Sequence, residues 1–206
     1  MSEKIYLHTM VERIWHWTNG FLIILLVLTG MQLHWPDTFT FFGAFSNAVL
    51  IHNWSGILLI IDFFVWLIYN IVSKRISHYI LKKEEIYPGL IVQAKYYLYG
   101  IFKREPHPYT PTENNKFNPL QKLAYFVYMF IFMPLLLLSG ILYLYPECSS
   151  LILKIGGLKT IAIFHFIMAF VFTAFLIIHL YLSTTGDTIF SSLISMFTGY
   201  EEKKEH

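Results

Sequence analysis

Long apolar stretches alternate with polar connections along the chain. Four stretches carry almost no charged side chains and cover residues 14–33, 51–72, 120–145 and 158–183. A helix of about 20 apolar residues crosses the hydrocarbon core of a bilayer, whereas membrane β-strands alternate in polarity over about ten residues. Because these stretches are continuous, they predict an all-α membrane protein, a four-transmembrane-helix bundle that forms a single domain over residues 1–206. Pro134 predicts a kink in the third helix.

The central connection, residues 73–119, is more polar and contains most of the prolines of the chain. Within it, residues 89–103 combine apolar and aromatic side chains with Lys95 and Lys103, which predicts a short cytoplasmic interfacial helix. We expect residues 39–50 and 146–157 to be irregular connections on the other side of the membrane. The charged tail, residues 201–206, is expected to be disordered.

The composition agrees with a membrane protein. Hydrophobic residues make up 56% of the chain, charged residues only 14%, and the mean hydropathy is +0.54. A soluble domain of this length is less apolar. The first apolar stretch ends in Leu33-His34-Trp35-Pro36 with no small-residue cleavage site, so it is expected to be a helix of the protein rather than a removable signal.

The basic residues predict the orientation. Of the 15 Lys and Arg residues, 13 precede the first stretch, fall between Lys74 and Lys122, or lie in the tail, and only Lys154 and Lys159 lie on the other side. The positive-inside rule therefore places both termini and the central loop in the cytoplasm. The net charge of +2 follows from this bias and indicates no nucleic-acid partner.

Cysteine chemistry is limited to Cys148. A single cysteine excludes an internal disulfide, a CxxCH haem attachment and a cysteine-held iron–sulfur cluster. Any redox chemistry within this chain must then depend on histidine. We expect Cys148 itself to be an ordinary interfacial residue.

Two histidines mark the fourth apolar stretch. His165 and His179 are 14 residues apart, which places them within roughly 40° of one helix face and about 21 Å apart along the axis. Depth in the membrane supplies a partner for each. His16 and His179 lie near the cytoplasmic ends of their helices, whereas His52 and His165 lie near the opposite ends. The pattern predicts two histidine pairs at different depths.

Each pair is of the kind that closes both axial positions of a haem iron, and such a haem carries electrons rather than binding oxygen. The residue four positions after each histidine is small, as listed here: Gly20, Gly56, Ala169 and Ser183. Position i+4 lies on the same helix face, where a flat porphyrin needs room. The alternative is that each histidine is a packing residue and that the small residues mark helix–helix contacts.

Other polar residues have ordinary interpretations. The histidines in polar segments or at the interface are expected to bind nothing, and these are His8, His34, His78, His107 and His206. Asp62 lies in the middle of the second stretch, either as a proton relay or cofactor partner or as a protonated carboxyl bonded to a neighbouring helix. Arg13 and Lys122 either pair with haem propionates or anchor the helix ends.

Several motifs resemble a known family. They are Trp15-His16-Trp17 with Thr29-Gly30, His52-Asn-Trp-Ser-Gly56, Lys116-Phe-Asn-Pro-Leu-Gln-Lys122, and His165 with His179-Leu-Tyr-Leu-Ser-Thr-Thr-Gly186. Over nearly the whole chain these residues are similar to the di-haem cytochrome b membrane subunits of the prokaryotic b561-like group. That group includes subunits of thiosulfate reductase, formate dehydrogenase and [NiFe]-hydrogenase, and the Thr-Thr-Gly motif is most similar to the first of these. The central loop is longer than a minimal member would need.

The resemblance implies a quinone-reactive electron-transfer subunit of a respiratory oxidoreductase complex, not a stand-alone catalyst, in a bacterial or archaeal inner membrane. Two b-type haems would pass electrons between menaquinone or ubiquinone and a periplasmic redox partner. That partner would be an iron–sulfur subunit of a molybdenum or nickel–iron enzyme, or a multihaem cytochrome c. The quinone site would lie near His179, Asn118 and Gln121, although Asn118 is also a suitable N-cap before Pro119.

Two other functions are compatible with parts of the sequence. A haem-free membrane anchor, or a small proton or metal transporter, would use the histidines and Asp62 without binding haem. A zinc hydrolase has less support, because the sequence contains no HExxH motif.

Overall fold

The computed structural model describes residues 4–112, 115–145, 149–186 and 188–202. Four of its helical segments are long and apolar enough to cross a membrane: Met10–His34, Phe45–Val72, Pro119–Leu144 and Gly157–Ser183. The predicted four-helix membrane bundle is therefore confirmed. Cys148 lies outside the described residues.

The first two spanning helices form an antiparallel pair. Helix α1 (Met10–His34) begins in a capping box, in which Thr9 and Glu12 satisfy each other's backbone N–H groups, and packs mainly against α2 (Phe45–Val72). Gln32 closes the connection between them, because its amide donates to Gly43 O and accepts from Phe42 N, both at 2.9 Å.

The third span is helical throughout but not uniform. It consists of α4 (Pro119–Val127), a π-helical segment η5 (Tyr128–Phe132) and α5 (Met133–Leu144). The π-helical segment ends two residues before Pro134, whose missing N–H and bulky ring disturb an α-helix. The kink expected at Pro134 stays a prediction. Helix α5 packs mainly against the fourth span, α7 (Gly157–Ser183).

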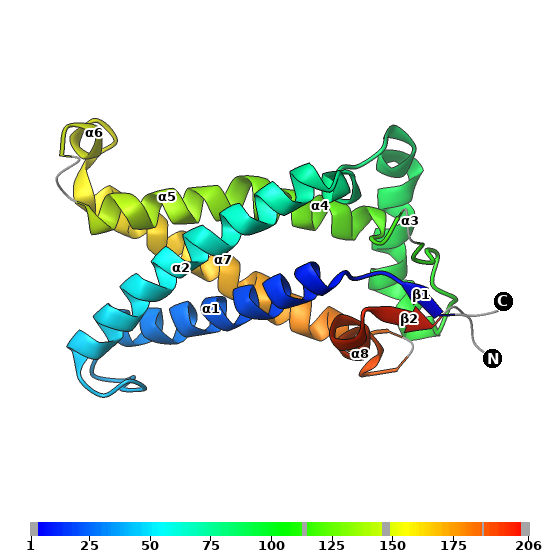
Figure 1. The fold of residues 1–206 in the computed structure, drawn as a ribbon, viewed down its shortest axis with the longest axis horizontal. Helices are drawn as coiled ribbons and strands as arrows, with labels where there is room; N and C mark the ends of the chain where they lie inside the picture. Colours follow the sequence, from blue (N-terminus) through cyan, green and yellow to red (C-terminus); the bar gives the residue numbers. More distant parts are fainter. Residues whose placement is uncertain (1–3, 113–114, 146–148, 187, 203–206) are drawn as a thin grey trace.

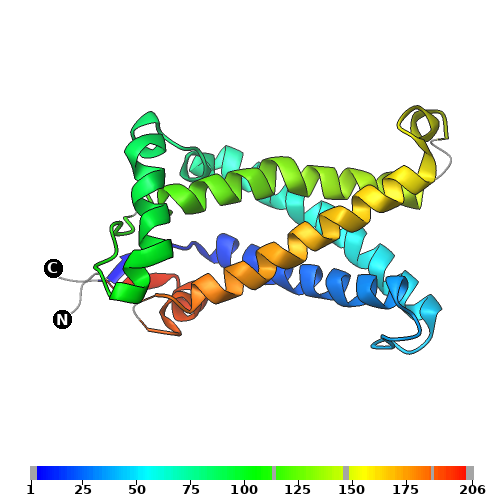
Figure 2. The same cartoon turned by 180° about the vertical axis from the view of Figure 1, so that it is seen from behind.

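Helices α2 and α7 run diagonally in opposite senses between α1 on one side and α4–α5 on the other (Figures 1 and 2). Both chain ends, α3 and α8 lie at one end of the bundle, which we call the terminal end (Figure 1). Buried aromatic and aliphatic side chains fill the centre, including Phe63, Trp66, Tyr128, Met133 and Phe172.

Several short elements cover the terminal end. The central connection contains η1 (Arg75–Tyr79), η2 (Glu85–Gly89), α3 (Leu90–Lys95), η3 (Tyr96–Gly100) and η4 (Ile101–Lys103). The last three continue one another and include the predicted interfacial helix, which lies across the end of the bundle (Figure 2). Its exposed Leu98, Tyr99 and Phe102 suit the headgroup region of a bilayer.

Three expectations about the connections are wrong. Residues 45–50 belong to α2 rather than to an irregular connection, because no helix-breaking residue follows Gly43 before the apolar stretch. The connection after α5 contains a short helix, α6 (Ser149–Lys154). The tail is not wholly irregular: after helix α8 (Ser191–Thr198), strand β2 (Tyr200–Glu202) pairs antiparallel with β1 (Lys4–Tyr6), so Glu201 and Glu202 are ordered by backbone hydrogen bonds.

Candidate functional site

Four histidines from three helices form two pairs. His16 of α1 faces His179 of α7 at the terminal end, with ring centroids 6.0 Å apart and an angle of 52° between the planes. His52 of α2 faces His165 of α7 nearer the opposite end, at 6.4 Å and 77°. The structure thus brings together the same two pairs that depth along the sequence predicted.

The spacing within each pair leaves room for one metal ion between the rings. An imidazole nitrogen lies about 2 Å from a bound transition metal, so two rings on opposite sides of one ion have centroids about 6 Å apart. Both measured separations match this value. Among the described residues, no group of three or more His, Cys, Asp or Glu side chains could hold a bare ion. The donor set therefore fits the two axial positions of a haem iron better than a closed metal site.

Space for a macrocycle is present beside both pairs. A Cβ atom built on Gly20 or on Gly56 would meet no atom within 4 Å. Each glycine lies one helical turn from its histidine, on the same face, as the sequence predicted. Ala169 and Ser183 occupy the equivalent positions on α7, and the Ser183 hydroxyl donates to Leu180 O rather than to another helix.

Two further glycines lie against the histidines: Gly140, which the sequence did not single out, and Gly30, which it offered only as part of the Thr29-Gly30 motif. A Cβ atom on Gly140 of α5 would come within 3.3 Å of His165 Cε1, and one on Gly30 within 3.8 Å of His52 Cε1. The signal for Gly140 was its position after Ser139, because adjacent small residues in a membrane helix commonly mark close packing.

Two hydroxyl groups contact the second pair, that of Thr29, which the sequence offered only as part of the Thr29-Gly30 motif, and that of Ser139, which it did not single out. Thr29 Oγ1 lies 2.8 Å from His52 Nδ1, and Ser139 Oγ lies 2.9 Å from His165 Nδ1. Each contact joins two different helices, α1 to α2 and α5 to α7. Both Nδ1 atoms are thereby occupied, which leaves Nε2 of each ring for a metal ion.

The pair at the terminal end has a different environment. His16 Nδ1 is buried and has no hydrogen-bond partner within the described ranges. The ring of Phe175 is nearly parallel to that of His179, at 6.0 Å and 9°. Arg13 lies one turn before His16, and its guanidinium donates to Phe197 O of α8 while its Nε stays buried without a partner in the described part of the chain.

Asn118 and Gln121 cap the start of α4. Asn118 Oδ1 accepts from Gln121 N at 2.9 Å and Gln121 Oε1 accepts from Asn118 N at 3.1 Å, while Asn118 Nδ2 donates to Tyr97 OH at 3.1 Å. The alternative that the sequence left open, helix capping, is thus realised. The cap does not use the NH₂ group of Gln121, whose two donors have no partner among the described residues.

An apolar groove of about 300 Å³ runs between α4–η5 and α7 beside these caps. It is lined by Leu120, Leu123, Ala124, Val127, Tyr128, Phe132, Val171 and Phe175. Phe175 connects this groove to His179. Its ring stacks on Tyr128 with centroids 4.0 Å apart, and it is also nearly parallel to the ring of His179.

Asp62 is bonded to the neighbouring helix. Asn19 Nδ2 of α1 donates to Asp62 Oδ2 at 3.0 Å, and both side chains are about nine-tenths buried. Asn19 was not singled out in the sequence. Its position three residues after His16 is the only hint that it shares the inward face of α1.

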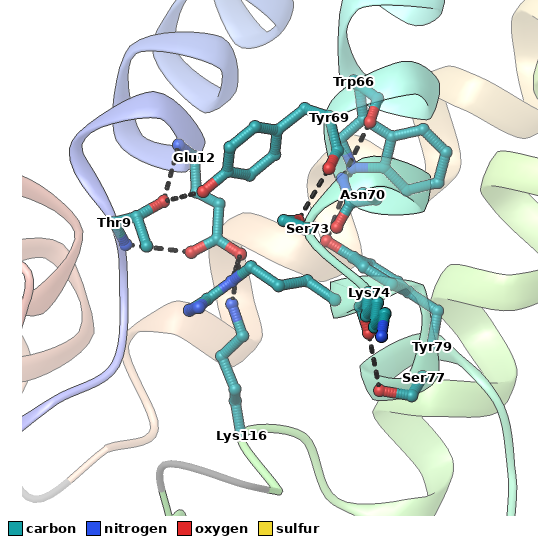
Figure 3. Close-up of polar contacts among 11 residues, drawn as sticks. Thr9, Glu12, Trp66, Tyr69, Asn70, Ser73, Lys74, Ser77, Tyr79 and Lys116 are labelled. Carbon is teal, nitrogen blue, oxygen red and sulfur yellow. Dashed lines mark hydrogen bonds and ion pairs between the residues drawn. The ribbon is translucent and has the colours of Figure 1, made fainter.

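A cluster of charges joins α1 to the central connection (Figure 3). The Glu12 carboxylate accepts from Lys116 Nζ at 2.5 Å and from Arg75 Nε at 3.0 Å, and Thr9 Oγ1 lies 2.9 Å from Tyr69 OH. The side chains of Glu12 and Lys116 are only 6% and 2% exposed. Burial lowers the pKa of Lys116, an effect that the charge of Glu12 opposes.

A second buried ion pair fixes Lys122, which the sequence offered as a propionate partner. Lys122 Nζ donates to Glu85 Oε1 at 2.6 Å, and the two side chains are 1% and 8% exposed. Tyr109 OH and Asn115 Nδ2 also donate to this carboxylate, each at 3.2 Å. Lys122 is therefore neutralised by protein groups.

Four other described histidines, His8, His34, His78 and His107, belong to neither pair. His34 stacks on Phe166 at 4.0 Å, and His107 packs against Tyr96. Burial, with a smaller effect of Lys116, lowers the pKa of His8 and of His78 to about 4, so both rings are neutral at pH 7. His206 lies outside the described residues.

Comparison with known proteins places this arrangement in a family. The family model described as prokaryotic cytochrome b561 matches residues 7–199. The chain is 36% identical over 201 residues to the putative cytochrome YdhU of Escherichia coli (strain K12), covering 97% of the chain and 75% of that protein. It is 24% identical over 216 residues to the probable Ni/Fe-hydrogenase B-type cytochrome subunit of Bradyrhizobium diazoefficiens, covering 93% of the chain and 84% of that protein.

The family and its relatives are named as cytochromes, so the chain is a multi-pass membrane protein that carries b-type haem and transfers electrons. The match spans both histidine pairs and all four membrane helices. This chain belongs to the prokaryotic cytochrome b561 family.

Proposed function

We propose that the protein is a di-haem cytochrome b subunit that passes electrons across the membrane between the quinone pool and a periplasmic redox partner. The observation that carries this proposal is the presence of two histidine pairs, each spaced for one haem iron, at two depths of the same bundle. His16 and His179 would hold one haem, and His52 and His165 the other. Each haem would supply a one-electron carrier with both axial positions closed.

The protein's own residues position these carriers. Helix α7 would contribute one ligand to each haem. The spacing of 14 residues between His165 and His179 sets the distance between these two ligands, about 21 Å along the helix axis. Gly20 and Gly56 leave the space into which the porphyrin faces would fit. The buried centre of the bundle between the two depths, with Met168 and Phe172, excludes water from the path between them.

The quinone would bind at the terminal end, beside the pair His16–His179. The groove along α4–η5 and α7 is apolar along its length, as an isoprenoid tail requires, and Phe175 links it to His179. Gln121 follows the groove residue Leu120, and its NH₂ group, which the cap does not use, would donate to a quinone carbonyl. We therefore assign Gln121 the headgroup contact and Asn118 mainly the support of the cap. Menaquinone and ubiquinone share the carbonyl and tail chemistry that this site uses.

The orientation follows from the distribution of charge. The terminal end carries the central connection with its Lys and Arg residues, so it would face the cytoplasm. The opposite end would face the periplasm, where Trp35, Phe41 and Phe45 are exposed around the loop held by Gln32. Such a fixed aromatic surface suits a stable protein partner. The name of the Bradyrhizobium relative, a probable Ni/Fe-hydrogenase cytochrome subunit, favours a nickel–iron enzyme as the partner over a molybdenum enzyme or a multihaem cytochrome c.

Haem stoichiometry and quinol reactivity test the proposal. The purified protein should contain two b-type haems per chain, and a quinol analogue should reduce them. Gln121→Leu should slow this reduction while both haems stay bound, whereas Leu138→Ala, on an exposed face of α5, should leave the rate unchanged. A preparation that is folded but contains no haem, or one haem, would contradict the proposal and favour the anchor or transporter alternative.

A further inference from the structure

The two histidine pairs differ in how their rings are held. In the pair His52–His165, each Nδ1 atom contacts a hydroxyl oxygen of another helix, that of Thr29 at 2.8 Å and that of Ser139 at 2.9 Å. In the pair His16–His179, the buried His16 Nδ1 has no hydrogen-bond partner within the described ranges. The same ligand type therefore occurs in one protein with and without a hydroxyl partner.

The direction of these hydrogen bonds follows from the other contacts of the hydroxyls. Thr29 Oγ1 lies 2.7 Å from Leu25 O, and Ser139 Oγ lies 2.8 Å from Leu136 O. A carbonyl oxygen can only accept, so each hydroxyl donates its single proton to its own helix backbone. The hydroxyl oxygen must then accept from the histidine, which makes Nδ1 the protonated nitrogen and leaves the lone pair on Nε2.

When the imidazole nitrogen that does not bind the metal donates a hydrogen bond, the ring becomes a stronger electron donor to the metal. A stronger donor stabilises ferric over ferrous iron and so lowers the reduction potential of a haem. We propose that Thr29 and Ser139 are positioning residues that fix the tautomers of His52 and His165 and lower the potential of the haem these ligands hold. This inference rests on the proposed di-haem function.

The structure supports a separate role for these hydroxyls beyond helix packing. Each bond crosses between helices, and a glycine follows each hydroxyl residue directly, which lets the histidine ring approach the helix. Thr173 of α7 provides a contrast. Its hydroxyl also donates to its own backbone, at 2.8 Å from Ala169 O, and it contacts no histidine ring within the described part of the molecule.

The test is an optical redox titration of the purified protein with both haems bound. Thr29→Val and Ser139→Ala, alone and together, remove the hydroxyl oxygens that contact the rings, while Thr29→Ser keeps the hydroxyl and Thr173→Val removes one that binds no histidine. We expect Thr29→Val and Ser139→Ala each to raise the reduction potential of the haem held by His52 and His165 and to leave that of the other haem unchanged. Loss of one such partner changes metal affinity by about tenfold or more, and a tenfold change in the ferric preference corresponds to about 59 mV for one electron.

A second readout separates positioning from a general loss of structure. The electron paramagnetic resonance spectrum of the low-spin ferric haem depends on the angle between its two imidazole planes, so one of the two haem signals should change in Thr29→Val and not in Thr29→Ser or Thr173→Val. Loss of one haem in Thr29→Val, with the other retained at its original potential, also supports the inference, because an unheld ring binds iron less well.

Three results would overturn the inference while leaving two haems, and hence the proposed function, intact. The first is that both haems keep their reduction potentials in the double variant. The second is that both potentials shift equally, and the third is that the potential of the haem held by His52 and His165 falls. A wild-type protein without two haems would instead contradict the proposed function itself.

Discussion

Glu12→Gln tests how the terminal end is held together. The glutamine keeps a side-chain oxygen for the backbone N–H of Thr9, so the capping box survives, but the carboxylate that faces Lys116 and Arg75 loses its charge. Lys116 is 2% exposed, and breaking a buried ion pair by removing one partner costs about 3–5 kcal/mol of unfolding free energy. Arg75 is 24% exposed, so its share is at most about 1 kcal/mol. We therefore expect Glu12→Gln to lower the free energy of unfolding by about 3–5 kcal/mol.

Equilibrium unfolding in mixed detergent micelles, followed by the fluorescence of the buried Trp66, measures this cost. The double variant Glu12→Gln with Lys116→Met should be more stable than Glu12→Gln alone, because it no longer leaves a buried ammonium without a counter-charge. Glu84→Gln, at an exposed position, should change the free energy by less than about 0.5 kcal/mol. A loss below about 1 kcal/mol in Glu12→Gln, or additive losses in the double variant, would refute the reasoning.

Three further predictions concern the haems and the pH dependence of stability. His52→Ala should remove one of two b-type haems and leave the other, as measured by the pyridine haemochrome absorbance per chain; a protein that retains both would contradict the pairing. Gly20→Leu should fold but lose the haem of His16 and His179, because the side chain enters space that is open beside the pair; size-exclusion chromatography checks the fold, and full haem content would show that the space is not used. As the pH falls from about 6.5 to about 4, the protein should lose stability, because the unfolded chain binds protons at His8 and His78 that the folded chain does not; His8→Gln should flatten this part of the stability–pH curve, and an unchanged slope would contradict the role of His8.

The spans and the histidine pairs were accessible from the sequence for a physical reason. The thickness of a bilayer imposes a length on apolar stretches, and in an antiparallel bundle the distance from a helix end converts directly into depth. His16 could therefore be matched to His179 without knowledge of helix packing. Gly20 and Gly56 were accessible by the same periodicity, because i+4 lies on the same face of any α-helix.

The hydroxyl partners could not be predicted in this way. A threonine or serine in a membrane helix usually bonds to its own backbone, and Thr29 and Ser139 do so as well. Their contacts with His52 and His165 depend on the rotation of neighbouring helices about their axes, which side-chain packing sets and periodicity leaves open. The same limit explains why Asn19 was missed as the partner of Asp62.

The central connection is better understood as a brace of the bundle than as a linker. Two nearly dry ion pairs tie it to the bundle, Lys116 to Glu12 of α1 and Glu85 to Lys122 of α4. Burying such charges is costly unless each is paired. A movement that separated either pair would leave an unpaired charge in an apolar environment, and the free-energy cost of that charge opposes the movement. Glu12 lies one turn before His16, and the groove beside α4 leads to His179. We therefore expect the two ion pairs to hold in place the helix that carries His16 and the helix that borders His179, so that separating either pair would disturb the arrangement of these two histidines.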